Sequence, residues 1–200
     1  MSEINAICVY CGSSPGTEPA FVEAARKFGQ ILAVNNVRLI YGGGSVGLMG
    51  ALAESVRQHG GEVTGVIPEF LTKRERPRQL RQELIVTRDM HERKRIMFER
   101  ADAFVALPGG IGTLEELVEQ LTWVQLGRHK KPILIANIDG YWGPLLSLID
   151  HMREVKFIPA AFRVDFLATK RVEEILPMLR ESARKVDEAE KTMAVPAERL

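Results

Sequence analysis

Apolar and polar residues follow two different periods along this 200-residue chain. Short, nearly continuous apolar runs are typical of buried strands, and they fall at about 4–10, 37–41, 62–67, 83–87, 101–107, 131–135 and 164–169. Apolar residues three or four positions apart are typical of helices, and they fall at about 17–33, 48–58, 89–98, 117–126, 144–152 and 171–184. Asp89 is expected to be a helix N-cap, and the basic segment 68–81 is expected to be a turn-rich surface region.

The alternation of strands and helices defines the expected fold. Because the strands are apolar throughout, both faces of the sheet should be covered by helices. We therefore expect an α/β protein of the Rossmann-like, doubly wound type, with a mostly parallel sheet flanked by helices. A single α/β domain should span residues 1–182, and a charged C-terminal tail should follow over 183–200.

Composition and charge narrow the class of partner. The formal net charge is +1, from 27 basic and 26 acidic residues, so no strong nucleic-acid or membrane-binding field is expected. No apolar run approaches the roughly 20 residues that cross a bilayer. The first residues lack the basic and apolar pattern of a signal peptide, and there are only two cysteines. A cytoplasmic protein with reduced thiols is therefore expected.

Three turns rich in glycine or serine, at 11–16, 42–47 and 108–113, each follow a predicted strand. A sheet of this type binds ligands at the carboxyl ends of its strands. The third turn leads into a helix, whose N-terminus presents unpaired N–H donors and a partial positive charge. Glycines there allow close backbone approach to an anion, most simply a phosphate. Glu115 and Glu116 follow within one turn, which phosphate binding alone does not explain and which indicates chemistry.

The second turn, Gly42-x-Gly44-x-x-Gly47, matches the dinucleotide-binding fingerprint between strand and helix. Glu62 has about the right spacing for the acid that binds ribose, but it begins its strand and would lie at the wrong end of the sheet. A nicotinamide dinucleotide is therefore disfavoured. Two readings remain open: the glycines only permit a tight turn, or they allow close backbone approach to a smaller nucleotide.

Other candidate motifs give mostly negative results. Cys8-x-x-Cys11 lacks the second cysteine pair of a zinc site, and Cys8 lies within a strand, so buried structural cysteine is favoured over redox or metal chemistry. The chain has no Gly-x-x-x-x-Gly-Lys phosphate loop. Metal-ligand spacing is also absent. A kinase or ATPase is therefore not expected.

Two pairs of neighbouring charged residues are candidates for the site. Arg93 and Lys94 begin a helix just after a strand, and Arg93 offers a planar fork for a phosphate, ribose or carboxylate. Glu115 and Glu116 point about 100° apart on a helix, so only one faces the glycine turn well. Glu116 shares a face with Gly112, four residues earlier, whereas pairing with the helix dipole explains Glu115 adequately.

The motif Pro108-Gly109-Gly110-x-Gly112-Thr113-x-x-Glu116 resembles the signature of the LOG family, cytokinin riboside 5′-monophosphate phosphoribohydrolases long labelled "lysine decarboxylase-like". The resemblance covers roughly residues 4–180. It extends to further motifs, namely Cys11-Gly12-Ser13-Ser14, Tyr41-Gly42-Gly43-Gly44, Gly47-Leu48-Met49-Gly50, Met90-His91-Glu92-Arg93-Lys94, Thr122-Trp123-x-Gln125-Leu126-Gly127 and Asp139-Gly140-Tyr141. The departures are an arginine-rich segment at 73–82 and the cations that flank His129, and both could alter base preference.

The resemblance implies a Rossmann-like nucleotide-binding domain and an obligate homo-oligomer. It implies hydrolysis of the N-glycosidic bond of an N6-substituted adenosine 5′-monophosphate, with no cofactor and no metal. It also implies that Arg93 and Glu116 are the catalytic pair. The residues that it implies for substrate and phosphate binding are Gly12, Ser13, Gly43, Gly44, Glu75, Met90, Lys94, Gly109, Gly110, Gly112, Thr113 and Thr122.

The chemistry of the implied reaction agrees with these residue types. Cleavage of a glycosidic bond passes through an oxocarbenium-like sugar. A nearby carboxylate can stabilise the positive charge on this sugar or direct a water molecule to it. Two alternatives stay open: a non-catalytic nucleotide-binding protein, and a pyridoxal phosphate decarboxylase that would use Lys94, the only lysine placed near the proposed site. The sequence also leaves open the base, AMP or an isopentenyl-type AMP, and the choice between dimer and hexamer.

Overall fold

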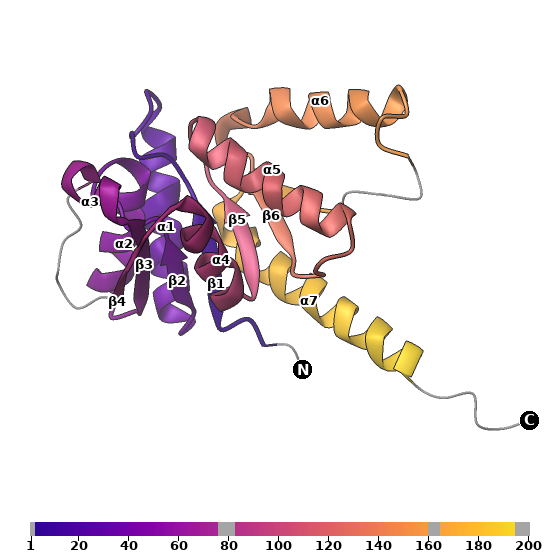
Figure 1. The fold of residues 1–200 in the computed structure, drawn as a ribbon, viewed down its shortest axis with the longest axis horizontal. Coiled ribbons are helices and arrows are strands. Elements are labelled where there is room, and N and C mark those ends of the chain that lie inside the picture. Colours follow the sequence, from indigo (N-terminus) through magenta and orange to yellow (C-terminus); the bar gives the residue numbers. More distant parts are fainter. Residues whose placement is uncertain (1–2, 76–82, 160–164, 195–200) are drawn as a thin grey trace, which may run out of the picture.

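A single parallel sheet forms the centre of the molecule (Figure 1). The computed structural model describes residues 3–75, 83–159 and 165–194. Every pair of neighbouring strands is parallel, and the strand order is β4-β3-β2-β1-β5-β6-β7. The strands are β1 (Ala6–Tyr10), β2 (Arg38–Tyr41), β3 (Val63–Pro68), β4 (Glu83–Thr87), β5 (Ala103–Ala106), β6 (Ile133–Ala136) and β7 (Leu167–Thr169). The expected α/β doubly wound fold is confirmed.

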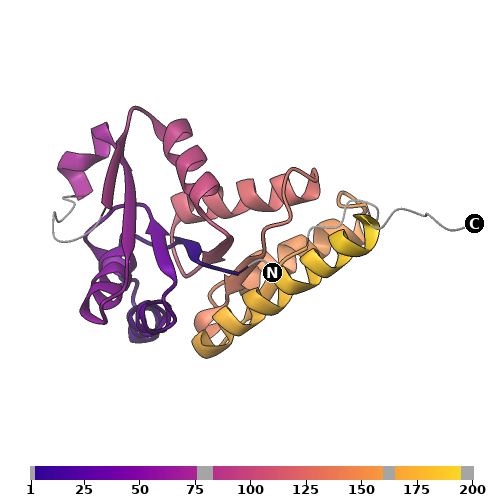
Figure 2. The same ribbon diagram turned by 90° about the horizontal axis from the view of Figure 1, so that it is seen from below.

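Helices cover both faces of this sheet (Figures 1 and 2). The helices are α1 (Pro19–Val34), α2 (Gly47–Gln58), α3 (Glu69–Glu75), α4 (Met90–Arg100), α5 (Ile111–Gln125), the 3-10 turn η1 (Ile138–Gly140), α6 (Gly143–Glu154) and α7 (Val172–Ala194). One hydrophobic cluster joins the sheet to α1, α2 and α7, and a second joins it to α4, α5 and α6.

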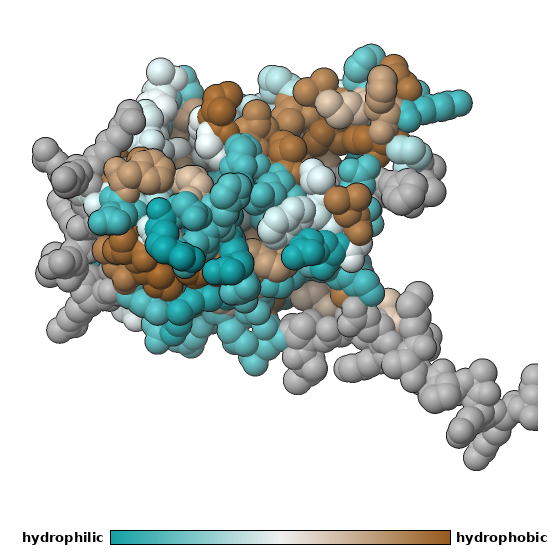
Figure 3. Space-filling view, viewed as in Figure 1, coloured by the Kyte–Doolittle hydropathy of each residue, from teal (hydrophilic) through white to brown (hydrophobic). Residues whose placement is uncertain are grey.

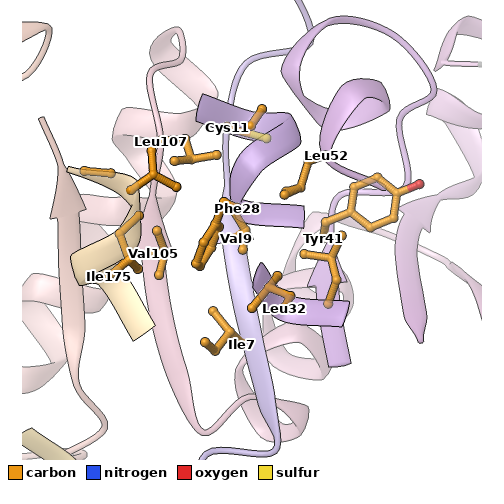
Figure 4. Packing of buried hydrophobic residues seen from close by; sticks show 14 of the residues in the cluster. Ile7, Val9, Cys11, Phe28, Leu32, Tyr41, Leu52, Val105, Leu107 and Ile175 are labelled. Atoms are coloured by element: carbon orange, nitrogen blue, oxygen red, sulfur yellow. The ribbon is translucent and has the colours of Figure 1, made fainter. Parts of the chain in front are cut away.

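The alternation of side chains along β1 explains why two clusters form. Ile7 and Val9 belong to the first cluster, and Cys8 and Tyr10 belong to the second, because successive residues of a strand point to opposite faces. Figure 4 shows the first cluster, in which Ile7 and Val9 lie toward Phe28 of α1. A strand buried on both faces must be apolar throughout, as the sequence pattern required.

The order of the strands places the ligand-binding edge. The chain runs outward from β1 through β2 and β3 to β4, and then returns to add β5 on the other side of β1. The connections that follow β1 and β5 therefore diverge, which makes this the topological switch point of the sheet, where α/β proteins of this type bind ligands. The Gly12 N–H donates to the Pro108 carbonyl oxygen at 3.0 Å, so a hydrogen bond joins the turn after β1 to the turn after β5.

Three expected boundaries are wrong. Residues 69–75 form helix α3 within the segment expected to be turns, because this stretch contains no glycine or proline to interrupt a helix. Helix α5 begins at Ile111, six residues before the expected start, so Gly112 and Thr113 lie in its first turn. Helix α7 continues to Ala194 instead of ending near 184, and its distal part extends away from the sheet (Figure 2).

Candidate active site

A cavity of about 340 Å³ lies at the carboxyl ends of β1 and β5. It collects residues from separate parts of the chain: the end of β1, the turn after it, α2, α3, α4 and the first turns of α5. The lining residues are Val9, Tyr10, Cys11, Gly12, Ser13, Gly42, Met49, Leu71, Met90, Arg93, Gly110, Ile111, Gly112, Thr113, Glu115 and Glu116. The volume falls within the range of about 300–1,000 Å³ that is usual for small-molecule sites.

The N-terminus of α5 opens into this cavity without a cap. Gly110 is the N-cap residue, and it has no side chain that could accept a hydrogen bond from the first turn. Among the described residues, none accepts a hydrogen bond from the backbone N–H of Gly110, Ile111, Gly112 or Thr113. A Cβ added at Gly110 or Gly112 would meet no atom within 4 Å, so open space surrounds both residues. Four free donors at the positive end of a 15-residue helix form an anion site.

Arg93 of α4 and Glu116 of α5 meet at the wall of the cavity. Arg93 Nη1 lies 3.2 Å from Glu116 Oε1, and only 8% of Arg93 and 7% of Glu116 is exposed. Arg93 Nε also donates to the Val66 carbonyl oxygen at 3.0 Å, which fixes the guanidinium plane. A Cβ at residue 42 would lie 2.3 Å from Arg93 Nη2, so Gly42 is the residue that leaves room for the guanidinium.

Burial changes the acidity of Glu116. Burial raises the pKa of the Glu116 carboxyl from 4.5 to about 7, although the Arg93 guanidinium opposes this rise and Glu115 adds to it. The contact with Arg93 lacks hydrogen-bond geometry, and Oε1 accepts no hydrogen bond from the described residues. A buried carboxylate with an unused oxygen, facing a cavity and titrating near neutral pH, is typical of a reactive group.

The turn before α2 has a different arrangement. Leu48 and Met49 both donate their backbone N–H to the Gly12 carbonyl oxygen, at 3.0 and 3.2 Å, so a protein group occupies the donors of this helix. Gly47 has φ +62°, and a Cβ there would lie 2.3 Å from the carbonyl carbon of Ser13. Glu62 pairs with Arg38 at the amino end of the sheet. Close packing therefore accounts for Gly42 and Gly47 of the fingerprint-like motif, and the dinucleotide interpretation has no support.

The structure brings together most of the residues predicted from the sequence. The predicted residues that line the cavity are Gly12, Ser13, Met90, Arg93, Gly110, Gly112, Thr113 and Glu116. Gly109 lines a smaller adjoining cavity of about 240 Å³ that shares Gly12, Ser13 and Gly110 with the first.

Four of the predicted residues whose side chains are described are not among the lining residues of the main cavity or its smaller neighbour. Gly44 lines a separate cavity between α1 and α2, and Gly43 is buried with φ +79°. Thr122 is exposed on α5, where its hydroxyl donates to the Val118 carbonyl oxygen. Glu75 is the last residue of α3, and its side chain lies outside the described part of the structure.

Lys94 is the fourth of these residues, and it joins α4 to α5. Its ammonium donates to Glu115 Oε1 at 2.6 Å and to Glu119 Oε1 at 3.0 Å. Burial alone would lower the pKa of Lys94, but the hydrogen bonds to these two carboxylates outweigh burial and raise it. The charge of Lys94 is therefore directed at two glutamates, one of which, Glu115, lines the cavity.

Sequence reasoning missed several apolar residues of the cavity. Met49 and Leu71 lie on its wall, and Ile111 lies at the start of α5 with 81% of its surface exposed. Leu71 was missed because its segment was expected to be turns. The position of an isoleucine between two glycines of the turn was the one signal available in the sequence for Ile111. Cys8 and Cys11 are buried free thiols, in agreement with the structural role expected of them.

The fold and the cavity together define an α/β protein with a candidate anion site and a buried Arg93–Glu116 ion pair. Residues 49–179 match the family model described as "Possible lysine decarboxylase". A cytokinin riboside 5′-monophosphate phosphoribohydrolase of Arabidopsis thaliana, LOG7, is 44% identical over 94% of this chain and 86% of its own length. A probable enzyme of the same name in Oryza sativa, LOG4, is 47% identical over 90% of this chain and 78% of its own length. The chain belongs to the LOG family.

Solved structures with lower identity share the fold. The molybdenum cofactor binding protein of Rippkaea orientalis aligns over 90% of this chain and 98% of its own, with a TM-score of 0.66 and 21% identity. The Moco carrier protein of Chlamydomonas reinhardtii aligns over 92% of this chain and 99% of its own, with a TM-score of 0.66 and 20% identity. At this level of identity the likeness concerns the fold alone. Within the described residues, no helix is long and apolar enough to cross a membrane.

Proposed function

We propose that this protein hydrolyses the N-glycosidic bond of adenosine 5′-monophosphate or an N6-substituted derivative, and releases the free base and ribose 5-phosphate. One observation carries the proposal: the uncapped N-terminus of α5 and the buried Arg93–Glu116 pair line the same cavity. The first is an anion site, and the second is a carboxylate that has one oxygen without a hydrogen bond. Both features fit the activity named for the Arabidopsis and rice relatives, because its substrate carries a phosphate and a glycosidic bond.

In the proposed mechanism the phosphate and the sugar use different parts of α5. The phosphate accepts hydrogen bonds from the N–H groups of Gly110 to Thr113, and this remote binding energy positions the ribose. Positive charge then develops on the ribose as the bond to the base breaks, and the Glu116 carboxylate stabilises it or orients the attacking water. Arg93 holds the Glu116 side chain in place and can assist the leaving base.

The alternative of a lysine decarboxylase finds no support at this cavity. Pyridoxal phosphate enzymes attach the cofactor to a lysine. No lysine of the described chain lines the cavity, and Lys94 is held by Glu115 and Glu119. These residues do not fit the cofactor. The remaining alternative, a nucleotide-binding protein without catalysis, differs from the proposal only in whether the bond is cleaved.

A product assay separates these alternatives. The purified protein is incubated with AMP and with isopentenyl-AMP, and ribose 5-phosphate and free base are quantified for each. We expect equal amounts of the two products from at least one substrate, and the ratio of the two rates gives the base preference. Nucleotide binding without release of ribose 5-phosphate, at any protein concentration, would contradict the proposal and favour the non-catalytic alternative.

We also propose that the protein is a homo-oligomer that associates through α5 and α6. Figure 3 shows hydrophobic residues gathered over α6 and the neighbouring part of α5. Apart from Ile111, which lines the cavity, the exposed large apolar residues on these two helices are Val118, Leu148 and Met152, and Leu126 is the C-cap residue of α5. Thr122 lies on the same face of α5 as Val118 and Leu126, because residues four apart on a helix are neighbours. A second copy on this face would therefore cover Thr122.

The mass of the protein in solution tests this proposal. Leu148→Asp should lower the mass measured by light scattering to that of one chain, 22.4 kDa. Val34→Asp is the matched control, because Val34 is an exposed apolar residue on α1, and it should leave the mass of the assembly unchanged. A wild-type protein that is monomeric at all concentrations would contradict the proposal.

We also propose a cytoplasmic location for the protein. The free thiols of Cys8 and Cys11 support a reducing compartment.

A further inference from the structure

Tyr141 contacts the glycine turn from a distant part of the chain. Its hydroxyl donates to the carbonyl oxygen of Gly109, 32 residues earlier. Its ring packs edge-on against Phe21 of α1, with centroids 5.4 Å apart, and against Trp142, with centroids 5.0 Å apart. The side chain also lines the smaller cavity that adjoins the site. Three separate contacts therefore fix the position of the hydroxyl.

The backbone before Tyr141 is held in an uncommon conformation. Asp139 has φ +50° and Gly140 has φ +75°, and a non-glycine residue in the left-handed region carries strain. Asn137 stabilises the turn, because its side-chain oxygen accepts a 2.7 Å hydrogen bond from the Trp142 N–H. Strain of this kind persists only where the surrounding contacts require it, and here the consequence is the direction of Tyr141.

Gly109 is tightly packed at the other end of this contact. A Cβ at Gly109 would lie 2.2 Å from Thr113 Oγ1 and 2.8 Å from Gly12 N. The peptide that joins Gly109 to Gly110 is planar and trans, so its C=O and its N–H point in opposite directions. A hydrogen bond that holds the Gly109 carbonyl toward Tyr141 therefore directs the Gly110 N–H away from Tyr141. Gly110 lines both cavities, whereas Tyr141 lines only the smaller one.

We infer that Tyr141 is a positioning residue for the nucleotide phosphate: by holding the Gly109 carbonyl, it orients the Gly110 N–H into the main cavity beside the donors of Ile111, Gly112 and Thr113. The inference rests on the proposed function for the identity of the anion. It assigns Tyr141 no contact with the substrate, because the residue acts through the Gly109–Gly110 peptide. The hydroxyl, and not the ring, carries the effect.

Tyr141→Phe removes the hydroxyl and keeps the ring, and Phe21→Leu is the matched control that weakens the ring packing and keeps the hydroxyl. The first readout is the dissociation constant for ribose 5-phosphate, measured by calorimetry. We expect Tyr141→Phe to raise it about fivefold, the equivalent of about 1 kcal/mol from one hydrogen bond. Phe21→Leu should lower the melting temperature but change this constant by less than about twofold.

The second readout separates positioning from a general loss of structure. For the nucleotide substrate, Tyr141→Phe should raise KM with little change in kcat, because the weakened contact is made before and during the reaction. An unchanged ribose 5-phosphate affinity in Tyr141→Phe, or an equal loss in Phe21→Leu, would overturn the inference. Absence of hydrolysis in the wild type would contradict the proposed function instead, and the ribose 5-phosphate titration would still decide the role of Tyr141.

Discussion

The turn at 42–47 and the turn at 108–112 have the same place in the architecture and different consequences. Each follows a strand of the parallel sheet, contains at least three glycines, and leads into a helix. At the first turn, the Gly12 carbonyl accepts hydrogen bonds from Leu48 and Met49, so the helix donors are used within the protein. At the second turn, the N–H groups of 110–113 face a cavity and have no acceptor among the described residues.

Glycine spacing alone therefore does not identify a phosphate site. The glycines of the first turn make room for protein atoms: Gly42 for the guanidinium of Arg93, and Gly47 for the backbone of Ser13. Gly110 and Gly112 of the second turn have open space where a side chain would lie. Similar sequences thus serve packing in one case and ligand access in the other.

The largest expected effect concerns Glu116. Helix α5, which follows the second turn, carries this carboxylate at the cavity, and α2, which follows the first turn, has no such carboxylate among the lining residues. Glu116→Gln should lower kcat by about 10²–10⁴-fold, because an amide neither stabilises a cationic sugar nor activates water. Glu115→Gln is the matched control, since Glu115 is half exposed and pairs with Lys94, and it should cost less than about tenfold. Steady-state kinetics on the nucleotide measure both, and equal losses in the two variants would remove Glu116 from its special role.

The next effect contrasts one glycine from each turn. Gly112→Ala should leave the free energy of unfolding unchanged or raise it by up to about 1 kcal/mol, because alanine favours a helix. It should weaken ribose 5-phosphate binding by about 10–100-fold, because a methyl group disturbs a charge-assisted hydrogen bond. Gly47→Ala should instead lower stability by at least about 2 kcal/mol, from its positive φ and its clash with Ser13.

Urea denaturation and ribose 5-phosphate titration of the same two variants provide the measurements. Binding must be compared at a temperature where both variants are folded. If Gly112→Ala were destabilised while Gly47→Ala lost affinity without loss of stability, the roles assigned to the two turns would be reversed.

The pH dependence of stability gives a further contrast between Glu116 and an ordinary surface carboxylate. The pKa of Glu116 is raised from 4.5 to about 7 in the folded protein, so the folded state holds this proton more tightly than the unfolded state. The resulting stability is present below pH 4.5 and is lost as the pH rises through 7. Between pH 5 and pH 8, wild type should lose about 2–3 kcal/mol relative to Glu116→Gln. Urea denaturation at both pH values measures this, and parallel pH profiles would contradict it.

The smallest expected effect concerns Lys94, which the sequence assigned to the substrate. Lys94→Met should lower the free energy of unfolding by about 1 kcal/mol, because Glu115 and Glu119 lose their shared cation. If Lys94 only joins α4 to α5, KM for the nucleotide should change by less than about threefold. A tenfold or larger increase in KM would instead return Lys94 to the substrate, as the family resemblance implies.

The sequence predicted the fold well because its signals are local. Continuous apolar runs defined the strands, and the Asp89 N-cap was confirmed, since its side chain accepts a hydrogen bond from the Glu92 N–H. The boundaries failed where no local residue marks them. Helix α5 begins at Ile111 between two glycines, a pattern that predicts a turn, and packing of Leu117 and Leu121 on the sheet overrides it.

The site was predictable only in part, because it depends on contacts distant in sequence. Arg93 and Glu116 were found from their helical positions and the family motif, and they meet in the structure. The pKa of Glu116 could not be predicted, because it follows from burial. The contact between Tyr141 and Gly109 has no local sequence signal either, since it spans 32 residues. The exposure of Thr122 likewise depends on which face of α5 the sheet covers.

An amide NMR titration of the ¹⁵N-labelled protein with ribose 5-phosphate tests most directly whether the N-terminus of α5 binds the phosphate. The N–H signals of Gly110, Ile111, Gly112 and Thr113 should shift most, in a saturable manner, because a phosphate accepts hydrogen bonds from these groups. The signals of Leu48 and Met49 should shift little, because the Gly12 carbonyl already accepts from them. If the largest shifts occurred at Leu48 and Met49 and the signals of 110–113 were unchanged, the N-terminus of α5 would not be the phosphate site.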